Sequence, residues 1–323
     1  MNYIGSKNLL TKFIYNTITS VVWYEFSIID WFAWTHQVGR FFKQRWHSVQ
    51  SIDQLHFSNV LWKLYIDNCE DMEFDFSKIQ SSWYKWFISK NYSYPLSERK
   101  YFTTENAMIF DDIRNRIEKI KWTPLYNRIL CSLIESMDSV SNTAWTYWAY
   151  LKSFKKSSLN KLSIKPSVII ESNKYCKHHQ WDCKEILKYI EADVLYIDPP
   201  YNTRQYNTYY HLLETMSLLD EPDIRGKTWL RNDSNWKSLW CSKSTAINEL
   251  EEVIKNANVK YIFMSYSNEW ILTYEQIKEV MEKYWEYSYK ELPYKKYRWD
   301  KEEARNHIWN QVIEYIHILK KPS

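Results

Sequence analysis

The sequence predicts an α/β fold in which helices cover both faces of an open sheet. Short apolar segments alternate with helical patterns over residues 26–53, and the same alternation resumes from residue 166. A third sign is the apolar segment 194–197, which leads directly into Asp198-Pro199-Pro200-Tyr201. Two consecutive prolines cannot continue a sheet ladder, so they fix an extended turn at the carboxyl end of a buried strand.

The first part of the chain is expected to form two strands, Phe26–Asp30 and Ser48–Asp53, around a helix at Val38–Arg45. Both strands end in an aspartate. Ligands of open α/β sheets bind at the carboxyl ends of the strands, and a carboxylate that ends the second strand can accept hydrogen bonds from ribose hydroxyls. Asp30 and Asp53 are therefore candidate binding residues.

The second α/β part has a longer series of elements. We expect strands at 167–171, 194–197 and 260–266, helices at 183–190, 206–219, 245–256 and 274–284, and a final antiparallel pair at 286–292 and 311–319. The sequence shows neither internal repeats nor a low-complexity tract. Its 323 residues suffice for one large domain or two smaller ones.

Residues 71–164 interrupt the α/β pattern. Helical periodicity is present at 103–121 and 125–138, with Lys, Arg and aromatic residues interleaved. The segment 151–161 has no acidic residue and contains four lysines: Lys152, Lys155, Lys156 and Lys161. Lysines separated by small hydroxyl residues are typical of phosphate contacts, and a solvated loop would have the same composition.

Two residue types are present in unusual numbers. The chain has 3 glycines and 18 tryptophans, whereas a chain of this length with roughly 7% glycine would have about 23 glycines. Several tryptophans, among them Trp34, Trp46 and Trp285, stand at expected turns or helix ends, where glycine is common. We hypothesise that most of these codons are UGA, read as glycine in the source organism and as tryptophan here. The alternative is a genuinely tryptophan-rich protein.

Global properties narrow the class of protein. A net charge of +4 and a pI of about 8.5 are compatible with nucleic-acid binding without establishing it. No apolar segment approaches the roughly 18 residues of a membrane span, and the first residues lack an apolar signal core, so we expect a cytoplasmic globular protein. Five irregularly spaced cysteines indicate reduced thiols. In the absence of an apolar heptad, we expect a monomer.

Four potential zinc ligands lie within eight residues: Cys176, His178, His179 and Cys183. Closed structural zinc sites usually draw on two separated pairs of ligands. We therefore expect no metal at this segment.

Three motifs occur in an order that resembles one known family. Asn2-Tyr3-Ile4-Gly5-Ser6-Lys7 stands first, Asp30–His36 with Asp53 follows, and Asp198–Tyr201 comes last. This order resembles the D12 class (Dam-like, α group) of DNA adenine-N6 methyltransferases, in which the DPPY motif follows the target-recognition segment. The resemblance spans nearly the whole chain, and it also includes 202–206, His211–Thr215, Gly226–Thr228 and Ser265–Glu269.

The resemblance implies a fold, a cofactor and a reaction. The fold is a class I (Rossmann-like) methyltransferase sheet with helices on both faces, formed by residues 1–70 and 165–323, with a mainly helical target-recognition domain inserted at 71–164. The cofactor is S-adenosyl-L-methionine. The reaction is transfer of its methyl group to N6 of a flipped-out adenine in double-stranded DNA. The enzyme would be an orphan or would work beside a cognate restriction endonuclease.

The resemblance also implies roles for individual residues. Asp198 and the Pro199 carbonyl would accept hydrogen bonds from the target amino group, and Pro200 and Tyr201 complete the motif, with Tyr201 stacked on the base. The implied cofactor-binding residues are Tyr3, Lys7, Asp30, Phe32, Asp53, Asp182 and Asp198. For Asp182 a helix N-cap is an equal alternative. The basic residues implied to contact DNA are Lys152, Lys155, Lys156, Lys161 and Arg204.

The predicted cofactor turn departs from the family pattern. The family has Phe-x-Gly-x-Gly, and this chain has Phe32-Ala33-Trp34-Thr35-His36. Glycine is needed there because the backbone must approach the ligand and can adopt positive φ. We expect a tryptophan at position 34 to block the pocket. Glycine at 34 would restore the first glycine of the pattern, while His36 would still replace the second.

Two other functions are compatible with the motifs. One is methylation of a different amino group, on cytosine N4, RNA or protein. The other is a catalytically inactive DNA-binding module, which the non-glycine His36 favours. The intact set Asp198, Tyr201 and Lys7 favours an enzyme.

Overall fold

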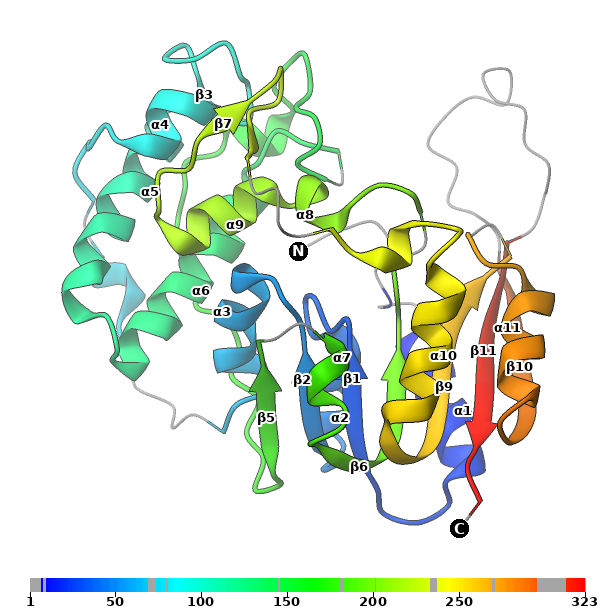
Figure 1. Ribbon diagram of the computed structural model, residues 1–323. Helices are drawn as coiled ribbons and strands as arrows, with labels where there is room; N and C mark the ends of the chain where they lie inside the picture. Colours follow the sequence, from blue (N-terminus) through cyan, green and yellow to red (C-terminus); the bar gives the residue numbers. More distant parts are fainter. Residues whose placement is uncertain are drawn as a thin grey trace.

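The fold is built around one seven-stranded sheet (Figure 1). The computed structural model describes residues 7, 10–68, 74–79, 81–144, 146–180, 183–200, 202–232, 237–268, 271–294 and 312–322. The strand order is β10-β11-β9-β6-β1-β2-β5. The strands are β1 Ser27–Trp31, β2 Ser48–Ile52, β5 Cys176–His179, β6 Glu191–Ile197, β9 Asn258–Ser267, β10 Glu286–Tyr294 and β11 Val312–Lys320.

All neighbouring strands pair in parallel except at β11, which is antiparallel to both β10 and β9. The predicted final antiparallel pair is therefore confirmed. The register places Asp30 of β1 beside Tyr196 of β6, and Trp31 beside Ile197. This pairing sets the carboxyl ends of β1 and β6 level with each other.

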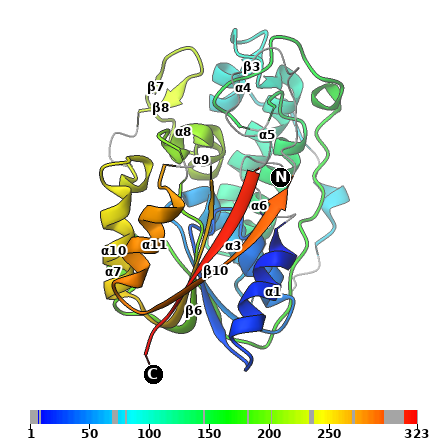
Figure 2. The same ribbon diagram turned by 90° about the vertical axis from the view of Figure 1, so that its right-hand side faces the viewer.

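Helices cover both faces of the sheet, as Figure 2 shows with the sheet between them. One face, which includes Ile28 and Val194, packs on α1 (Thr11–Val21), α2 (Gln37–Lys43) and α3 (His56–Tyr65). The other face, which includes Ile29 and Leu195, packs on α10 (Ala246–Asn256) and α11 (Tyr274–Glu282), with α7 (Cys183–Ile186) alongside. Adjacent residues of a strand point to opposite faces, which is why continuous apolar segments form these strands. The mixed α/β fold with a largely parallel sheet is thus confirmed.

The remaining helices form a second packed region beside the carboxyl ends of the strands (Figure 1). Its helices are α4 Phe87–Tyr92, α5 Thr104–Ile117, α6 Pro124–Ser139, α8 Tyr206–Tyr209 and α9 His211–Leu218. Short strand pairs accompany them: β3 Ser93–Tyr94 with β4 Phe102–Thr103, and β7 Ile224–Arg225 with β8 Leu230–Arg231. Single turns of 3-10 helix lie at Phe76–Lys78, Glu118–Ile120, Lys156–Leu159 and Leu239–Cys241.

Local sequence explains where the two long helices of this region begin. The Thr103 hydroxyl accepts a hydrogen bond from the amide of Asn106 at the start of α5, and Thr123 caps α6 in the same way through Tyr126. Proline at the first position of α6 has the φ that a helix needs and lacks only an amide that would be unpaired there. These signals made both helices predictable.

The chain after Pro200 also belongs to this helical region. The buried Arg114 of α5 donates to the carbonyls of Met216 and Ser217 at the end of α9. The Tyr101 hydroxyl donates to the carbonyls of Tyr147 and Thr228. Residues 206–231 therefore pack against 81–144, although they follow the sheet strand β6 in sequence.

Three expected elements differ from the structure, and one strand was not expected. Residues 167–171 form no strand, because the Ser167 amide donates to the Ser132 hydroxyl of α6 and not to a sheet neighbour. The helix expected at 206–219 is broken at Tyr210, whose φ of −125° and ψ of 20° are not helical. The helix expected at 183–190 ends at Ile186. Strand β5 was not predicted, because Cys-Lys-His-His lacks β-branched residues.

No helix in the described ranges is both long enough and apolar enough to cross a membrane.

Candidate active site

The strand order of the sheet reverses direction between β1 and β6. From β1 the chain continues outward to β2 on one side, and after the long connection it returns to β6 on the other side. Such a switch point is where open α/β sheets bind ligands. Asp30 lies at the end of β1, and the Asp198 amide donates to the carbonyl of Trp31 over 3.4 Å. The two aspartates that the sequence analysis selected therefore meet at this point.

Asp30 is held by the first turn of α2. Its side chain is 2% exposed, and Oδ2 accepts a hydrogen bond from the Gly39 amide at 2.8 Å. A β-carbon on residue 39 would lie 3.1 Å from that oxygen and 3.0 Å from Ile66, so glycine allows this close approach. Burial raises the pKa of Asp30 to about 7; the Gly39 amide opposes this shift, and the nearby charges of Asp198 and Asp53 add to it.

Asp53 connects the end of β2 to the predicted cofactor turn. Oδ1 accepts from the Leu55 amide and Oδ2 from the Trp34 amide, both at 2.9 Å. Burial raises the pKa of Asp53 to about 6, although these amides stabilise the carboxylate. The carboxylate that was predicted to bind ribose hydroxyls therefore also positions the backbone of residue 34.

The turn Phe32–His36, which was predicted to bind the cofactor, has an unusual backbone. Phe32, Trp34 and His36 have positive φ angles of 62°, 48° and 58°. Positions 34 and 36 are the two glycine positions of Phe-x-Gly-x-Gly. Positive φ is uncommon for a residue that carries a β-carbon, and it is an outlier for a bulky one. The backbone conformation of the turn is thus retained, while its residues are not glycines.

Aromatic rings fill the space beside this turn. The Trp34 ring packs edge-on against Tyr210 and Tyr206, with ring centroids 4.2 and 4.9 Å apart. Phe32 stacks on Trp31 at 4.7 Å. The two carboxylates suit a ligand that carries an ammonium group and ribose hydroxyls. The Trp34 ring does not suit it, because the ring projects from the turn whose backbone must approach that ligand.

The side of the site that includes Asp198 contains a buried charge cluster that links three distant parts of the chain. Lys7 Nζ lies 3.0 Å from Asp198 Oδ1 and 2.9 Å from Glu314 Oε1. The Ser265 hydroxyl also donates to Glu314 Oε1. Glu314 is 1% exposed on β11. Sequence analysis missed Glu314; the only available sign was an acidic residue among the apolar residues of β11.

This cluster sets the protonation of Asp198. Burial raises its pKa to about 6; the Lys7 ammonium opposes the shift and the Glu314 charge adds to it. For Lys7, burial alone would lower the pKa, but the charges of Asp198 and Glu314 outweigh burial and hold it well above its usual value. The ammonium therefore stays charged, and the Asp198 side chain remains 21% exposed beside it. Lys7, predicted to hold the cofactor, contacts the predicted catalytic aspartate Asp198 in the structure.

Three predicted site residues, Tyr3, Asp182 and Tyr201, lie outside the described residues. Pro199 and Pro200 are both buried directly after β6. Their burial fixes the direction in which the chain leaves the sheet.

The predicted DNA-contact residues lie in the helical region and differ in their surroundings. Lys152 and Lys156 are exposed. Lys155 donates to the Thr143 carbonyl at 2.8 Å, and burial lowers its pKa. Lys161 lies 3.9 Å from Glu105, and the exposed Arg204 guanidinium lies 5.1 Å from the Trp148 ring.

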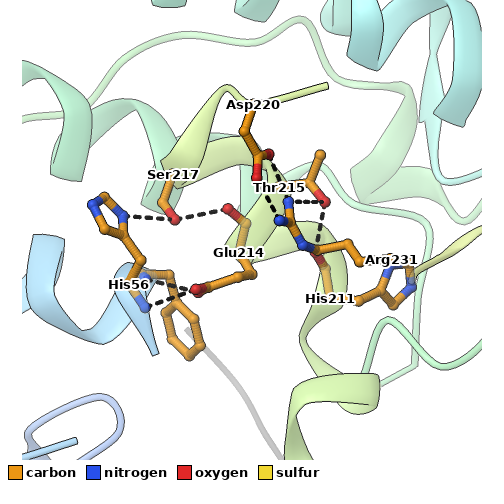
Figure 3. Close-up of polar contacts among 8 residues, drawn as sticks. His56, His211, Glu214, Thr215, Ser217, Asp220 and Arg231 are labelled. Carbon is orange, nitrogen blue, oxygen red and sulfur yellow. Dashed lines mark hydrogen bonds and ion pairs between the residues drawn. The ribbon is translucent and has the colours of Figure 1, made fainter. Parts of the chain in front are cut away.

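A polar network joins α3, which packs on the sheet, to α9 of the helical region (Figure 3). The Glu214 carboxylate of α9 accepts hydrogen bonds from the amides of His56 at 2.8 Å and Phe57 at 3.0 Å. These amides open α3, which follows Asp53. Arg231 contacts Thr215 one residue further along α9, and it also pairs with Asp220. Glu214 therefore fixes the cofactor side of the sheet to the helix that follows the catalytic turn.

The two histidines weighed as zinc ligands have other contacts. His178 Nδ1 bonds to the Ser51 hydroxyl at 2.9 Å, and His179 Nε2 to the Gln50 side chain at 3.0 Å. Within the described ranges, no three His, Cys, Asp or Glu side chains are arranged to hold a metal ion.

The largely parallel sheet with acidic residues at its switch point defines an α/β protein with a ligand site of the doubly wound kind, and comparison with known proteins defines the family. The chain belongs to the D12 class N6 adenine-specific DNA methyltransferases, whose family model matches residues 3–284. The chain is thus a DNA adenine-N6 methyltransferase.

Three relatives illustrate the similarity. Type II methyltransferase M.NlaIII of Neisseria lactamica is 38% identical over 334 residues, which cover 99% of each chain. Type II methyltransferase M.FokI of Planomicrobium okeanokoites is 36% identical over 99% of this chain and 53% of its own length. Modification methylase StsI of Streptococcus sanguinis is 33% identical over 98% of this chain and 52% of its own. The chain thus spans about half the length of the latter two. No solved structure matches it.

Proposed function

We propose that this methyltransferase modifies adenine in a flipped-out position of double-stranded DNA, with S-adenosylmethionine as methyl donor, and that it serves a type II restriction system. One observation carries the proposal most directly. Asp198 meets Asp30 at the switch point of the sheet and is held there by Lys7. The names of its relatives, type II methyltransferases and a modification methylase, support the biological role.

The residues of the catalytic half act on the target amino group. Lys7 holds Asp198 Oδ1, and the target amino group donates hydrogen bonds to the Asp198 carboxylate and to the Pro199 carbonyl. These bonds favour a more tetrahedral nitrogen, whose lone pair is less delocalised into the ring. Positioning of this kind can supply a large part of a rate enhancement. Tyr201 stacks on the extruded base, because a base inside a duplex cannot reach a pocket.

The cofactor half supplies contacts to the methyl donor. When bound, S-adenosylmethionine provides a methyl group on a sulfonium. Asp30 faces its ammonium group, Asp53 its ribose hydroxyls and Phe32 its apolar part; Tyr3 and Asp182 complete the set by resemblance. This assignment requires that the side chain at position 34 does not occupy the space beside the turn.

DNA binding belongs to the helical region. We assign target recognition to residues 71–164, and the packing of 206–231 against 81–144 adds that segment to the same unit. The exposed Lys152, Lys156 and Arg204 contact phosphates. Lys155 and Lys161 make weaker contacts, because each already has a protein partner.

Methyl transfer from labelled S-adenosylmethionine to unmethylated duplex DNA tests this function. Label at adenine N6 in one sequence context supports it. Label at cytosine N4, or on RNA or protein only, would replace the proposed substrate.

A second candidate function is a DNA-binding module without catalysis. The non-glycine residues at positions 34 and 36 of the cofactor turn favour it. Calorimetry separates the two functions, since an inactive module would bind DNA but not S-adenosylmethionine.

A further inference from the structure

Among the described residues, four tryptophans have a backbone conformation that favours glycine. Trp34, Trp46, Trp122 and Trp229 have φ angles of 48°, 64°, 76° and 52°. Few residues with a β-carbon adopt positive φ, and those that do are mostly Asn, Asp and His. In contrast, Trp285 does not have positive φ. The backbone at this predicted helix-end position therefore does not require glycine.

The clearest case is Trp122. The Thr123 amide donates to the Ile120 carbonyl at 3.1 Å, Lys121 has φ −50° and ψ 144°, and Trp122 has φ 76°. These angles define a type II turn, which requires positive φ at its third residue and therefore glycine or asparagine. Trp122 is 90% exposed, so packing does not compensate for the strain.

Trp46 and Trp34 lead to the same conclusion from different structures. Trp46 follows α2, where the His47 amide donates to the Phe42 carbonyl; this is a Schellman helix end, whose left-handed residue is usually glycine. Trp34 occupies the first glycine position of the cofactor turn, and its amide is fixed by Asp53. A helix end, a tight turn and a ligand loop share no sequence, only the requirement for positive φ.

We propose that residues 34, 46, 122 and 229 are glycine in the functional polypeptide, encoded by UGA codons that the source organism reads as glycine. This goes beyond the scarcity of glycine, because it names the positions from backbone geometry. Its consequence for residue 34 rests on the proposed function: glycine there removes the ring beside the cofactor turn.

The codons and the native peptides test the proposal without any activity measurement. All four codons should be UGA, and UGG at any of them would overturn the proposal for that position. Tryptic cleavage after Lys121 and Arg128 releases residues 122–128 as one peptide. In protein from the source organism this peptide should begin with Gly-Thr-Pro. A peptide that begins with Trp-Thr-Pro would contradict the inference.

Variants of the printed chain give a second test. Trp122→Gly and Trp46→Gly should each raise the thermal midpoint by about 2–4 °C, because the turn is freed of strain. Trp62→Gly is the matched control: Trp62 lies inside α3, 7% exposed, and donates to Asn59. Its replacement should lower the midpoint. Equal losses in all three variants would contradict the proposal.

Residue 34 is tested by ligand binding. Trp34→Gly should gain at least a tenfold tighter affinity for S-adenosylmethionine in calorimetry. If the peptides contain glycine but the Trp34→Gly protein binds no S-adenosylmethionine, the proposed function fails while the glycine assignment stands. If the peptides contain tryptophan and the printed chain binds S-adenosylmethionine, the glycine assignment fails while the function stands.

A second inference comes from the charge cluster on β11. We infer that Glu314 is a positioning residue for methyl transfer. The Lys7 ammonium lies between Glu314 Oε1 and Asp198 Oδ1. Glu314 therefore fixes the position of the ammonium that holds Asp198. The Ser265 hydroxyl fixes the Glu314 oxygen that Lys7 uses. This inference rests on the proposed function, since it assumes that Asp198 accepts the target amino group.

Glu314→Gln tests this role. We expect kcat to fall at least tenfold, with KM for DNA changed less than twofold, because Glu314 does not touch the substrate. The acid limb of the pH–rate profile should move to lower pH, because loss of a negative charge lowers the pKa of Asp198. Glu291→Gln, exposed on the neighbouring strand β10, is the control and should change neither quantity.

Two measurements keep this inference testable on their own. NMR titration of the Asp198 carboxyl measures the same downward shift of its pKa without turnover. The shift can therefore be measured even in an inactive variant. Ser265→Ala changes less and should move the titration in the same direction if Glu314→Gln fails to fold. An unchanged Asp198 titration in the folded variants would overturn the inference.

Discussion

The two halves of the switch point differ in how their carboxylates are held. On the catalytic side, Asp198 is compensated by the Lys7 ammonium, which Glu314 shares. On the cofactor side, Asp30 and Asp53 are held by backbone amides, at Gly39, Leu55 and Trp34. The carboxylate beside the DPPY turn is thus held by a charged side chain, and those beside the predicted cofactor turn are held by the backbone. The predicted cofactor turn departs from Phe-x-Gly-x-Gly at two positions, Trp34 and His36.

The largest expected effect is on the catalytic side. Asp198→Asn should lower methyl transfer at least about 100-fold, because the amide cannot accept hydrogen bonds as a carboxylate does. Binding of S-adenosylmethionine should survive in part, because Asp30 and Asp53 are unchanged. Transfer assays and calorimetry, both with Trp34→Gly as the background, measure the two effects. Glu191→Gln, exposed at the other end of β6, should leave both unchanged. Normal turnover by Asp198→Asn would refute the role.

The cofactor side should respond in affinity. Asp53→Ala removes the carboxylate that accepts from the amides of Leu55 and residue 34. It also removes the proposed ribose contact. We expect S-adenosylmethionine to bind about 10- to 100-fold more weakly, equivalent to about 1–3 kcal/mol. Calorimetry in the same Trp34→Gly background measures this loss. An unchanged affinity would remove Asp53 from the cofactor site.

Loss of the contact between α9 and α3 should lower the stability of the protein. Glu214→Ala deletes the carboxylate that accepts from the amides of His56 and Phe57 at the start of α3. We expect a loss of about 1–3 kcal/mol in the free energy of unfolding. Denaturant unfolding measures it, with Glu279→Ala on the exposed face of α11 as control. A loss no larger than that of the control would show that the Glu214 contact between α9 and α3 does not stabilise the protein.

Four carboxyl groups in and near the site should take up protons at unusually high pH. The pKa values of Asp30, Asp53, Asp198 and Glu214 are raised to about 7, 6, 6 and 7. Taken alone, these carboxyls stabilise the folded state as pH falls from about 7 to about 4, because they bind protons more tightly there than in the unfolded chain. Five histidines act in the opposite direction, because burial lowers their pKa to about 4 or below: His36, His56, His178, His211 and His317. Carboxyl NMR of the ligand-free protein isolates the four carboxyls, which should titrate near pH 6 to 7. Titration of all four near pH 4 would contradict their burial.

The smallest effect is expected at the DNA surface. Lys152→Gln and Lys156→Gln should each weaken DNA binding equally for all sequences and reduce the dependence of log K on log salt by about 1. Lys155→Gln should change this slope less, because its ammonium already binds the Thr143 carbonyl. Binding at several salt concentrations measures the slopes. Equal slopes for all variants would exclude this segment from the phosphate contacts.

The sequence predicted the continuous apolar strands and the capped helices better than the elements that depend on distant partners. Strands that end in Asp30 and Asp198 are continuous apolar segments buried on both faces, so their pattern was visible without the partners. Strand β5 and the break at Tyr210 depend on partners far away in sequence, such as β2 and the Tyr147 carbonyl. Local patterns carry no record of such contacts.

The candidate site shows the same division. Asp30, Asp53 and Asp198 stood out because each directly follows or ends a strand. Glu314 did not, because its role depends on Lys7, 307 residues away. Residue 34 was recognised as a glycine position from the family pattern, and the positive φ supplies the physical reason.

Methyl transfer to unmethylated duplex DNA, compared between the printed chain and a version with glycine at 34, 46, 122 and 229, tests the central claim most directly. The account predicts label at adenine N6 with the glycine version and at least tenfold less with the printed chain. No transfer to DNA by either version would contradict the proposed substrate. Equal transfer by both would contradict the conclusion that the cofactor turn requires glycine.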